Sequence, residues 1–405
     1  MRSLASPLPK IHRSSHATSA DLIQDSRPIS ANAPHWLILP AHMDTESKDT
    51  ARARADQEYG AQRRRVLAHG PGPDLDWRVR IAGLGRYLPQ RRVASAEIEQ
   101  RVGLPAGWAL HNSGVAFRHW AQPEHERASW MGAQAARMAC EQAGIAVGDV
   151  DLIVNASGSA ERAIPDGGPL LQRELGLGRS GIPALSVHAT CLSFVAALEL
   201  AAERIHHGRI ERALIVSSEI ASVGLDFDSP EVCTLFGDGA AAAVLERAPD
   251  DSPSRIHRIA WRTMGEGVEI TTLRGGGSWR PPLGPLTTPA DAVFSMQGQA
   301  ALRSGIRLVP YVMRQLGLDD RAARDGLRWV AAHQASRAAL DVIAQIGFEH
   351  ARMVNTLEHT GNCIAASIPL ALEQGVREGT IRRGEPGVLL GTGAGLSGVG
   401  LTMTY

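Results

Sequence analysis

Three polar residues of this sequence stand where a segment of strand character gives way to a turn or a helix. Cys191 lies in Ser-Val-His-Ala-Thr-Cys-Leu-Ser-Phe, His333 in Val-Ala-Ala-His-Gln-Ala-Ser, and Asn362 in His-Thr-Gly-Asn-Cys-Ile-Ala-Ala-Ser. Each has an ordinary structural interpretation: a small buried thiol, a hydrogen-bonded histidine, or a turn residue beside glycine. A functional role is favoured because all three stand at strand ends, and Cys191 and Asn362 occupy equivalent places in two halves of the chain.

The place of Cys191 at the start of a predicted helix indicates a nucleophile. A helix N-terminus carries a partial positive charge and free N–H groups. Both stabilise a thiolate and lower the pKa of a cysteine. His188, three residues earlier, is interpreted first as a structural hydrogen-bonding partner and second as a group that tunes the thiolate.

Segments of strand and helix character alternate from Trp77 onward. In the first half, strands are expected at residues 79–82, 152–156, 184–187, 213–217 and 240–245, and helices at 127–143 and 191–206. The second half repeats this order, with strands at 329–332, 353–357 and 388–391 and a helix at 365–375. This alternation predicts an α/β fold with parallel sheets and a duplicated core, in which strand ends from both halves meet at one site.

Three parts of the chain are expected. Residues 1–76 are rich in Ser, Pro, Ala, His and Arg and show no hydrophobic periodicity, so we interpret them as a disordered extension. A translation start placed too early, with Met43 as a candidate, and an Arg-rich transit peptide are the alternatives. Residues 77–250 form the half with the nucleophilic cysteine, and residues 251–405 form the half with the histidine and asparagine.

Composition excludes several classes of chemistry. The 42 basic and 42 acidic side chains cancel, which gives no reason to expect nucleic-acid or anionic-membrane binding. Lys10 and Lys48 are the only lysines, so the body has neither a Walker-type phosphate loop nor a lysine for pyridoxal phosphate. The spacing of the four cysteines matches no metal-binding motif. Such sparse, unpaired cysteines are typical of proteins in a reducing compartment. Residues 83–85 lack the third glycine of a dinucleotide fingerprint, and we interpret them as a strand-end turn.

From about residue 78 to 405 the sequence resembles the β-ketoacyl-acyl-carrier-protein synthase III family of the thiolase superfamily. The resemblance is carried by ordered motifs: Ala-Thr-Cys-Leu-Ser-Phe at 189–194, Phe-Gly-Asp-Gly-Ala at 236–240, His-Gln-Ala-Ser at 333–336, and Gly-Asn-Cys-Ile-Ala-Ala-Ser at 361–367. It implies a thiolase-like fold, whose two pseudo-duplicated halves form a layered α-β-α-β-α core. It also implies a β-ketoacyl synthase III-type acyltransferase that needs no cofactor or metal.

The resemblance assigns a role to each site residue. Cys191 accepts the acyl group as a thioester, and a malonyl-type thioester then loses CO2 and condenses with it. His333 and Asn362 donate to the enolate oxygen, and the backbone N–H groups of Cys191 and Ala394 form the oxyanion hole.

The sequence departs from the family in the residues that hold substrate. Ser336 replaces an asparagine of the histidine motif, and Thr392 replaces a bulky residue near the acyl pocket. Trp108 is kept where the family grips coenzyme A, but Asn112 stands in place of an arginine. Arg337 alone remains of the basic residues that dock the carrier protein. The chemistry is therefore better supported than the identity of either substrate.

Three functions are weighed. The first is decarboxylative Claisen condensation in fatty-acid or specialised metabolism, with acyl-CoA or acyl-carrier-protein thioesters as partners. The second is acyl transfer to an alcohol or amine, or condensation without decarboxylation, on the same site. The third is a non-catalytic partner subunit, which would have no need for the three polar residues. We expect a cytoplasmic homodimer without a membrane span.

Overall fold

The computed structural model describes residues 71–122, 124–348 and 352–405, all within the compact unit Gln62–Tyr405. Two five-stranded sheets form its frame. The first, in the order β1-β7-β6-β4-β5, contains β1 (Val79–Tyr87), β4 (Leu152–Asn155), β5 (Ala184–Ser186), β6 (Arg212–Glu219) and β7 (Gly239–Arg247). The second, in the order β12-β11-β13-β14-β8, contains β8 (Arg255–Thr263), β11 (Trp329–Ala332), β12 (Arg352–Met353), β13 (Pro386–Gly393) and β14 (Ser397–Thr404).

The two sheets share one pattern of strand directions. In the first, β4 runs parallel to β5 and β6, while β7 and β1 continue antiparallel. In the second, β11 runs parallel to β12 and β13, while β14 and β8 continue antiparallel. The predicted duplication is therefore confirmed at the level of sheet topology.

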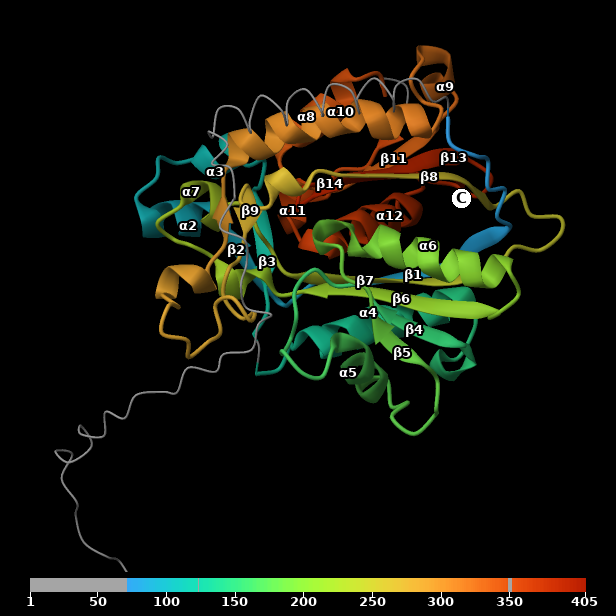
Figure 1. Ribbon diagram of the computed structural model, residues 1–405, viewed down its shortest axis with the longest axis horizontal. Coiled ribbons are helices and arrows are strands. Elements are labelled where there is room, and N and C mark those ends of the chain that lie inside the picture. The colour runs from blue at the N-terminus through green and yellow to red at the C-terminus, as the bar shows by residue number, and fades with distance from the viewer. Residues whose placement is uncertain (1–70, 123, 349–351) are drawn as a thin grey trace, which may run out of the picture. The chain divides into compact units, whose positions relative to one another are not determined.

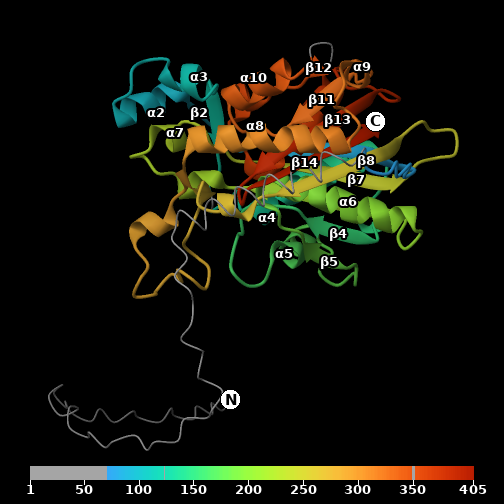
Figure 2. The ribbon, with the colours of Figure 1, turned by 45° about the horizontal axis from the view of Figure 1, so that its top comes forward.

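Helices separate and cover the sheets. Helices α6 (Ser193–His206) and α12 (Ser367–Arg377) lie between the sheets and contribute to one core with strands of both. Helices α4 (Ala128–Ala143) and α5 (Gly167–Glu174) cover the first sheet from outside, and α8 (Gly298–Gln315) and α10 (Arg337–Gln345) lie over the second (Figure 1). The turned view keeps these groups on opposite sides (Figure 2). The expected α-β-α-β-α layering is confirmed.

Smaller elements surround this core: β2 (Arg91–Ala94), β3 (Phe117–Trp120), β9 (Thr271–Thr272), β10 (Ser295–Met296), α2 (Ser95–Val102), α3 (Trp108–Asn112), α7 (Pro230–Cys233), α9 (Arg321–Asp325) and α11 (Leu357–Thr360). In the described part of the chain, no helix has the length and apolar character needed to cross a membrane.

Two sequence predictions need correction. The strand expected at 353–357 ends at Met353, because the side chain of Gln334 accepts the N–H groups of Thr356 and Leu357 (3.0 Å each) and so removes them from strand pairing. Gly83 and Gly85 are not a strand-end turn but lie inside β1. A Cβ atom on either would approach a backbone oxygen of α4 within 2.1 Å, so these glycines allow the helix to pack on the strand.

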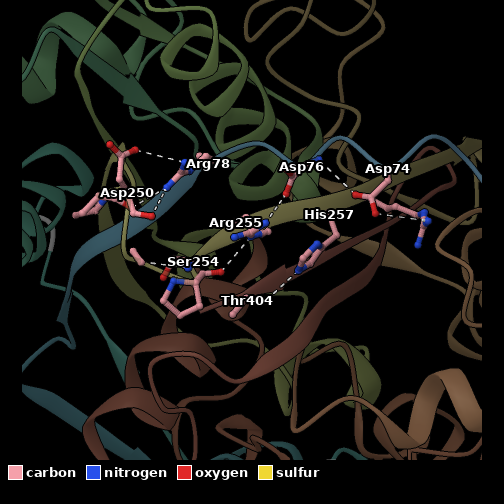
Figure 3. A network of polar contacts seen from close by, with 12 residues as sticks. Asp74, Asp76, Arg78, Asp250, Ser254, Arg255, His257 and Thr404 are labelled. Carbon is pink, nitrogen blue, oxygen red and sulfur yellow. Dashed lines mark hydrogen bonds and ion pairs between the residues drawn. The ribbon is translucent and has the colours of Figure 1, made fainter.

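The last residues of the expected extension, 71–76, belong to the described part of the chain and pack on the folded body. Residues 1–70 lie outside it, but residues 74–78 run along β8 (Figure 3). The backbone of Trp77 exchanges hydrogen bonds with β8, Asp76 pairs with Arg255 at 2.9 Å, and Arg78 donates to the Asp250 carbonyl at 2.7 Å. The segment just before β1 is therefore part of the folded body.

Candidate active site

One cavity of about 1560 Å³ contains all three predicted catalytic residues in its lining. Cys191 reaches it from the turn after β5, His333 from the end of β11, and Asn362 from the turn before α12. The loop after β4 and the glycine-rich end of β13 complete this part of the wall. Strand ends from both halves thus meet at one place, as the duplicated pattern predicts.

Cys191 lies in a tight turn between β5 and α6. The turn is a short 3-10 helix, η3 (Thr190–Leu192), and Thr190 has a positive φ of 51°. Gly393 of β13 packs so closely that a Cβ atom there would lie 2.8 Å from Thr190 Oγ1. This approach brings the backbone N–H of Ala394 to the Cys191 sulfur, beside the N–H of Cys191 itself. Two amide donors therefore lie next to the sulfur of Cys191.

The pKa of the Cys191 thiol does not follow the prediction from its helix N-terminus. Burial raises it to about 12, and the charge of Glu219 acts in the same direction. The N–H groups of Ala394 and Cys191 lower it, but by less than burial raises it. The predicted lowering is therefore wrong. The half-buried cysteine is a thiol at neutral pH, and its attack on a thioester requires a proton acceptor.

His333 is a buried imidazole immediately after β11. Its backbone N–H donates to the Leu390 carbonyl (2.8 Å), and a Cβ atom on Gly391 would lie only 3.0 Å from His333 Cβ. Burial lowers the pKa of His333 to about 4, so the ring is neutral at pH 7. Among the described residues its Nδ1 has no hydrogen-bond partner. A neutral imidazole offers one N–H donor and one acceptor, which suits either proton transfer or enolate binding.

Asn362 is oriented by its surroundings. It forms an isolated parallel bridge with Phe236, within the Phe-Gly-Asp-Gly motif, which holds its backbone. Its side-chain oxygen accepts the Ile364 N–H (2.9 Å) and the Ser367 hydroxyl (3.4 Å). The carboxamide nitrogen makes a long 3.5 Å contact with the Ala335 carbonyl. Because the oxygen is occupied by donors, the N–H₂ group is left to donate toward the cavity.

The four residues predicted to bind substrate fall into two groups. Thr392 lines the cavity and faces α8, where a Cβ atom on Gly305 would lie 3.7 Å from its methyl group. Trp108, Asn112 and Arg337 do not line it. The Asn112 amide donates to the Trp108 carbonyl (2.9 Å), so it is turned back onto its own helix.

Three further residues make contacts near the site, and of these Glu219 was not predicted. Ser336, which replaces the family's asparagine, caps α10 by accepting the Ala339 N–H (3.3 Å). The Nε2–H of His188 donates to the Gly158 carbonyl (3.0 Å), which supports its structural interpretation. Glu219 is fully buried behind the cavity wall, and its only sequence signal is an acidic residue closing an apolar strand. No group of three potential metal ligands occurs among the residues that the structure describes.

The two halves match in a register different from the predicted one. Ser193 begins α6 and Ser367 begins α12, and each hydroxyl accepts the backbone N–H four residues earlier (2.9 and 3.1 Å). Counted from these serines, the counterpart of Cys191 is Ala365 and the counterpart of Asn362 is His188. Cys191 and Asn362 belong to equivalent turns, but not to equivalent positions.

Comparisons with known proteins agree with this architecture. A family model described as 3-oxoacyl-[acyl-carrier-protein] synthase III matches residues 185–265, and a model of its C-terminal part matches residues 319–405. These segments contain Cys191 and both His333 and Asn362. A β-ketoacyl-[acyl-carrier-protein] synthase III of Neisseria meningitidis serogroup C is 32% identical over 328 residues, covering 81% of this chain and 99% of the relative. One from Sphingopyxis alaskensis is 34% identical over 321 residues, covering 79% and 97%.

Solved structures of related enzymes are also similar. The 3-oxoacyl-[acyl-carrier-protein] synthase III of Aquifex aeolicus has a TM-score of 0.70 at 25% identity, covering 81% of this chain and all of that one (100%). The priming β-ketosynthase of the R1128 polyketide pathway has a TM-score of 0.72 at 26% identity, covering 83% and 98%. The fold is thus thiolase-like, and the chain belongs to the β-ketoacyl-[acyl-carrier-protein] synthase III family.

Proposed function

We propose that this enzyme joins an acyl group held on Cys191 to the two-carbon unit of a malonyl-type thioester, with loss of CO2. Its family makes it a condensing enzyme and a transferase. The observation that carries the residue assignment is the common cavity, in which a thiol faced by two backbone N–H groups lies with two neutral side-chain donors. That set supports a two-step acyl transfer better than hydrolysis, which would have no use for Asn362.

In the first step, the Cys191 sulfur attacks the carbonyl of an acyl thioester. As the C–S bond forms, the sulfur loses its proton to the neutral His333, which passes it to the leaving thiolate, so that one thioester replaces another. The developing oxyanion lies against the N–H groups of Cys191 and Ala394. A thiol with a raised pKa is unreactive until a thioester and a base are both in place.

In the second step, the malonyl carboxylate leaves as CO2, and its electron pair becomes an enolate. The His333 N–H and the Asn362 carboxamide donate to the enolate oxygen, and each such donor is typically worth about 3 kcal/mol. The enolate carbon attacks the acyl-Cys191 carbonyl, the C–S bond breaks, and the thiolate takes up a proton from solvent, which neutralises the charge that CO2 leaves behind. Both donors are neutral at pH 7, because a carboxamide carries no charge and burial lowers the pKa of His333.

The acyl donor is best supplied by a carrier protein rather than by coenzyme A. Asn112 offers no charge to a phosphate, and its amide is already bound to the Trp108 carbonyl. The names of the relatives place the β-ketoacyl product on an acyl carrier protein, which supports a carrier protein as a partner in the condensation. A cytoplasmic homodimer remains our expectation for the working form.

Intact-protein mass after mixing with a panel of acyl-CoA and acyl-carrier-protein thioesters tests the first step. We expect an adduct that maps to Cys191 and forms faster from the carrier protein. Addition of malonyl-carrier protein should then release CO2 and a β-ketoacyl product. An adduct elsewhere would contradict the nucleophile, and faster acylation from acyl-CoA would contradict the donor.

A further inference from the structure

The end of β6 places a buried carboxylate immediately behind the nucleophile's turn. Glu219 is 0% exposed, and its side chain accepts hydrogen bonds from the N–H of Gly158, the N–H of Ser159 (3.0 Å) and the Ser159 hydroxyl. The backbone N–H of Ala365 faces the same carboxylate. One side chain therefore ties the loop after β4 to the turn that follows Asn362, across the two halves of the molecule.

The loop that Glu219 holds is also fixed from its other side. The Gly158 carbonyl accepts the Nε2–H of His188 (3.0 Å), while the Gly158 N–H is bound by Glu219. A Cβ atom on Gly158 would lie 2.6 Å from Ile364 Cγ2 and 2.9 Å from the Thr190 carbonyl oxygen. The loop is thus pressed against the turn that carries Cys191 and the turn that carries Asn362. Any shift of Gly158 would move one or both of them.

Glu219 also acts on Cys191 through its charge. The ionisable groups around it are the thiols of Cys191 and Cys363, the Asp238 carboxyl that acts on Cys363, and His188 across Gly158. The charge of Glu219 contributes to the raised pKa of Cys191. Burial raises the pKa of Glu219 itself to about 7, against the lowering by its hydrogen-bond donors. Its charge is therefore present above pH 7 and lost as the pH falls below that value.

We propose that Glu219 is a positioning residue that fixes the Gly158 loop against both catalytic turns, and that its negative charge disfavours the Cys191 thiolate. This proposal deepens the proposed function, because it concerns the same nucleophile. It assigns to the first half of the duplicated core a residue that touches neither substrate nor sulfur directly.

The charge is tested by alkylation of Cys191 with iodoacetamide, measured by peptide mass in wild type and in Glu219→Gln from pH 6 to 9. Glutamine keeps the shape and one acceptor but removes the charge. Above pH 7 we expect about tenfold faster alkylation in the variant, because loss of a nearby like charge lowers a pKa by about one unit. Near pH 6 the two rates should converge, because Glu219 is then protonated in the wild type. This assay needs no acyl substrate, so its outcome is independent of the proposed condensation.

Asp238→Asn is the matched control. Asp238 is another fully buried carboxylate, which accepts the N–H groups of Ala121 (2.7 Å) and Ser222 (2.8 Å). Its loss should leave the alkylation profile of Cys191 unchanged. An equal rise in both variants, or no rise in Glu219→Gln, would overturn the proposal.

Two further measurements keep the test decisive if Glu219→Gln does not fold. In the wild type, the logarithm of the Cys191 alkylation rate, plotted against pH, should flatten around pH 7 and rise again above it. A straight line of unit slope would contradict the charge effect. Glu219→Asp keeps the charge but shortens the reach to Gly158. It should show the wild-type pH profile and slower acylation of Cys191, whereas unchanged acylation would contradict the positioning role.

Discussion

The turns before α6 and α12 have the same backbone but carry different chemistry. Each contains a residue with positive φ, Thr190 at 51° and Ile364 at 47°, three residues before the serine that begins the helix. In the first turn the next residue is Cys191, and in the second it is Ala365.

The strand ends that face these turns differ in the same way. The end of β13 is Gly393, which lets the Ala394 N–H reach the sulfur of Cys191. The end of β6 is Glu219, whose carboxylate faces the N–H of Ala365. Duplication therefore supplied two similar frames, of which one carries the nucleophile. In the other turn the carboxylate of Glu219 faces the backbone N–H of Ala365, and its bonds to Gly158 and Ser159 connect the two halves.

The largest expected effect comes from removing the nucleophile. Cys191→Ala should abolish the acyl adduct in intact-protein mass spectra, because no other described thiol shares the amide donors of this turn. Cys363→Ala is the control, since Cys363 is the buried thiol of the second turn. The control should keep the adduct. An adduct that persists in Cys191→Ala and disappears in Cys363→Ala would reverse the comparison.

The second effect concerns the donors that the second half supplies. His333→Ala and Asn362→Ala should each slow malonyl decarboxylation by roughly a hundredfold to a thousandfold, the usual loss for one donor to an oxyanion. The double variant should be little worse than either, because both donors serve one developing charge. Release of labelled CO2 measures this step. Wild-type decarboxylation in both single variants would remove their enolate role.

A smaller effect is expected where β13 meets the first turn. In Gly393→Ala the added Cβ would lie 2.8 Å from Thr190 Oγ1, so either the Thr190 side chain or the strand end before Ala394 must shift. Acylation of Cys191 should fall about tenfold to a hundredfold, within the range for a weakened oxyanion donor. Gly178→Ala is a suitable control, because a Cβ atom there meets nothing within 4 Å. Equal rates in both variants would show that the close approach is unnecessary.

The smallest effect is on stability at low pH. Burial holds the pKa of His333 at about 4, below its ordinary value of 6.5. The unfolded chain therefore binds a proton first as the pH falls, and the folded state loses stability below pH 6.5. Between pH 7 and pH 5 this amounts to ~2 kcal/mol, the cost of keeping the ring neutral at pH 5. His333→Gln should lack this loss in urea unfolding at the two pH values, and an unchanged pH dependence would contradict a buried neutral ring.

Local sequence determined much of this protein. Strand and helix periodicity predicted the parallel strands and the inner helices, because such patterns reflect which face of a segment is buried. The motifs around Cys191, His333 and Asn362 predicted the residues that meet in the cavity. The predicted order of elements placed each candidate residue at a strand end, and the family resemblance supplied the layering that brings the two halves together.

Contacts between distant segments were decided only by the tertiary structure. The pKa of Cys191 depends on burial and on Glu219, and neither can be read from a helix N-terminus alone. Gly83 and Gly85 gain their meaning from α4, and Asn112 turns back onto its own helix. The register of the two catalytic turns also depends on serines whose matching role appears only in their hydrogen bonds. Packing, charge and hydrogen bonding act between residues that are far apart in the chain. These contacts therefore determined the protonation of Cys191 and the register of the two catalytic turns, which local sequence patterns could not predict.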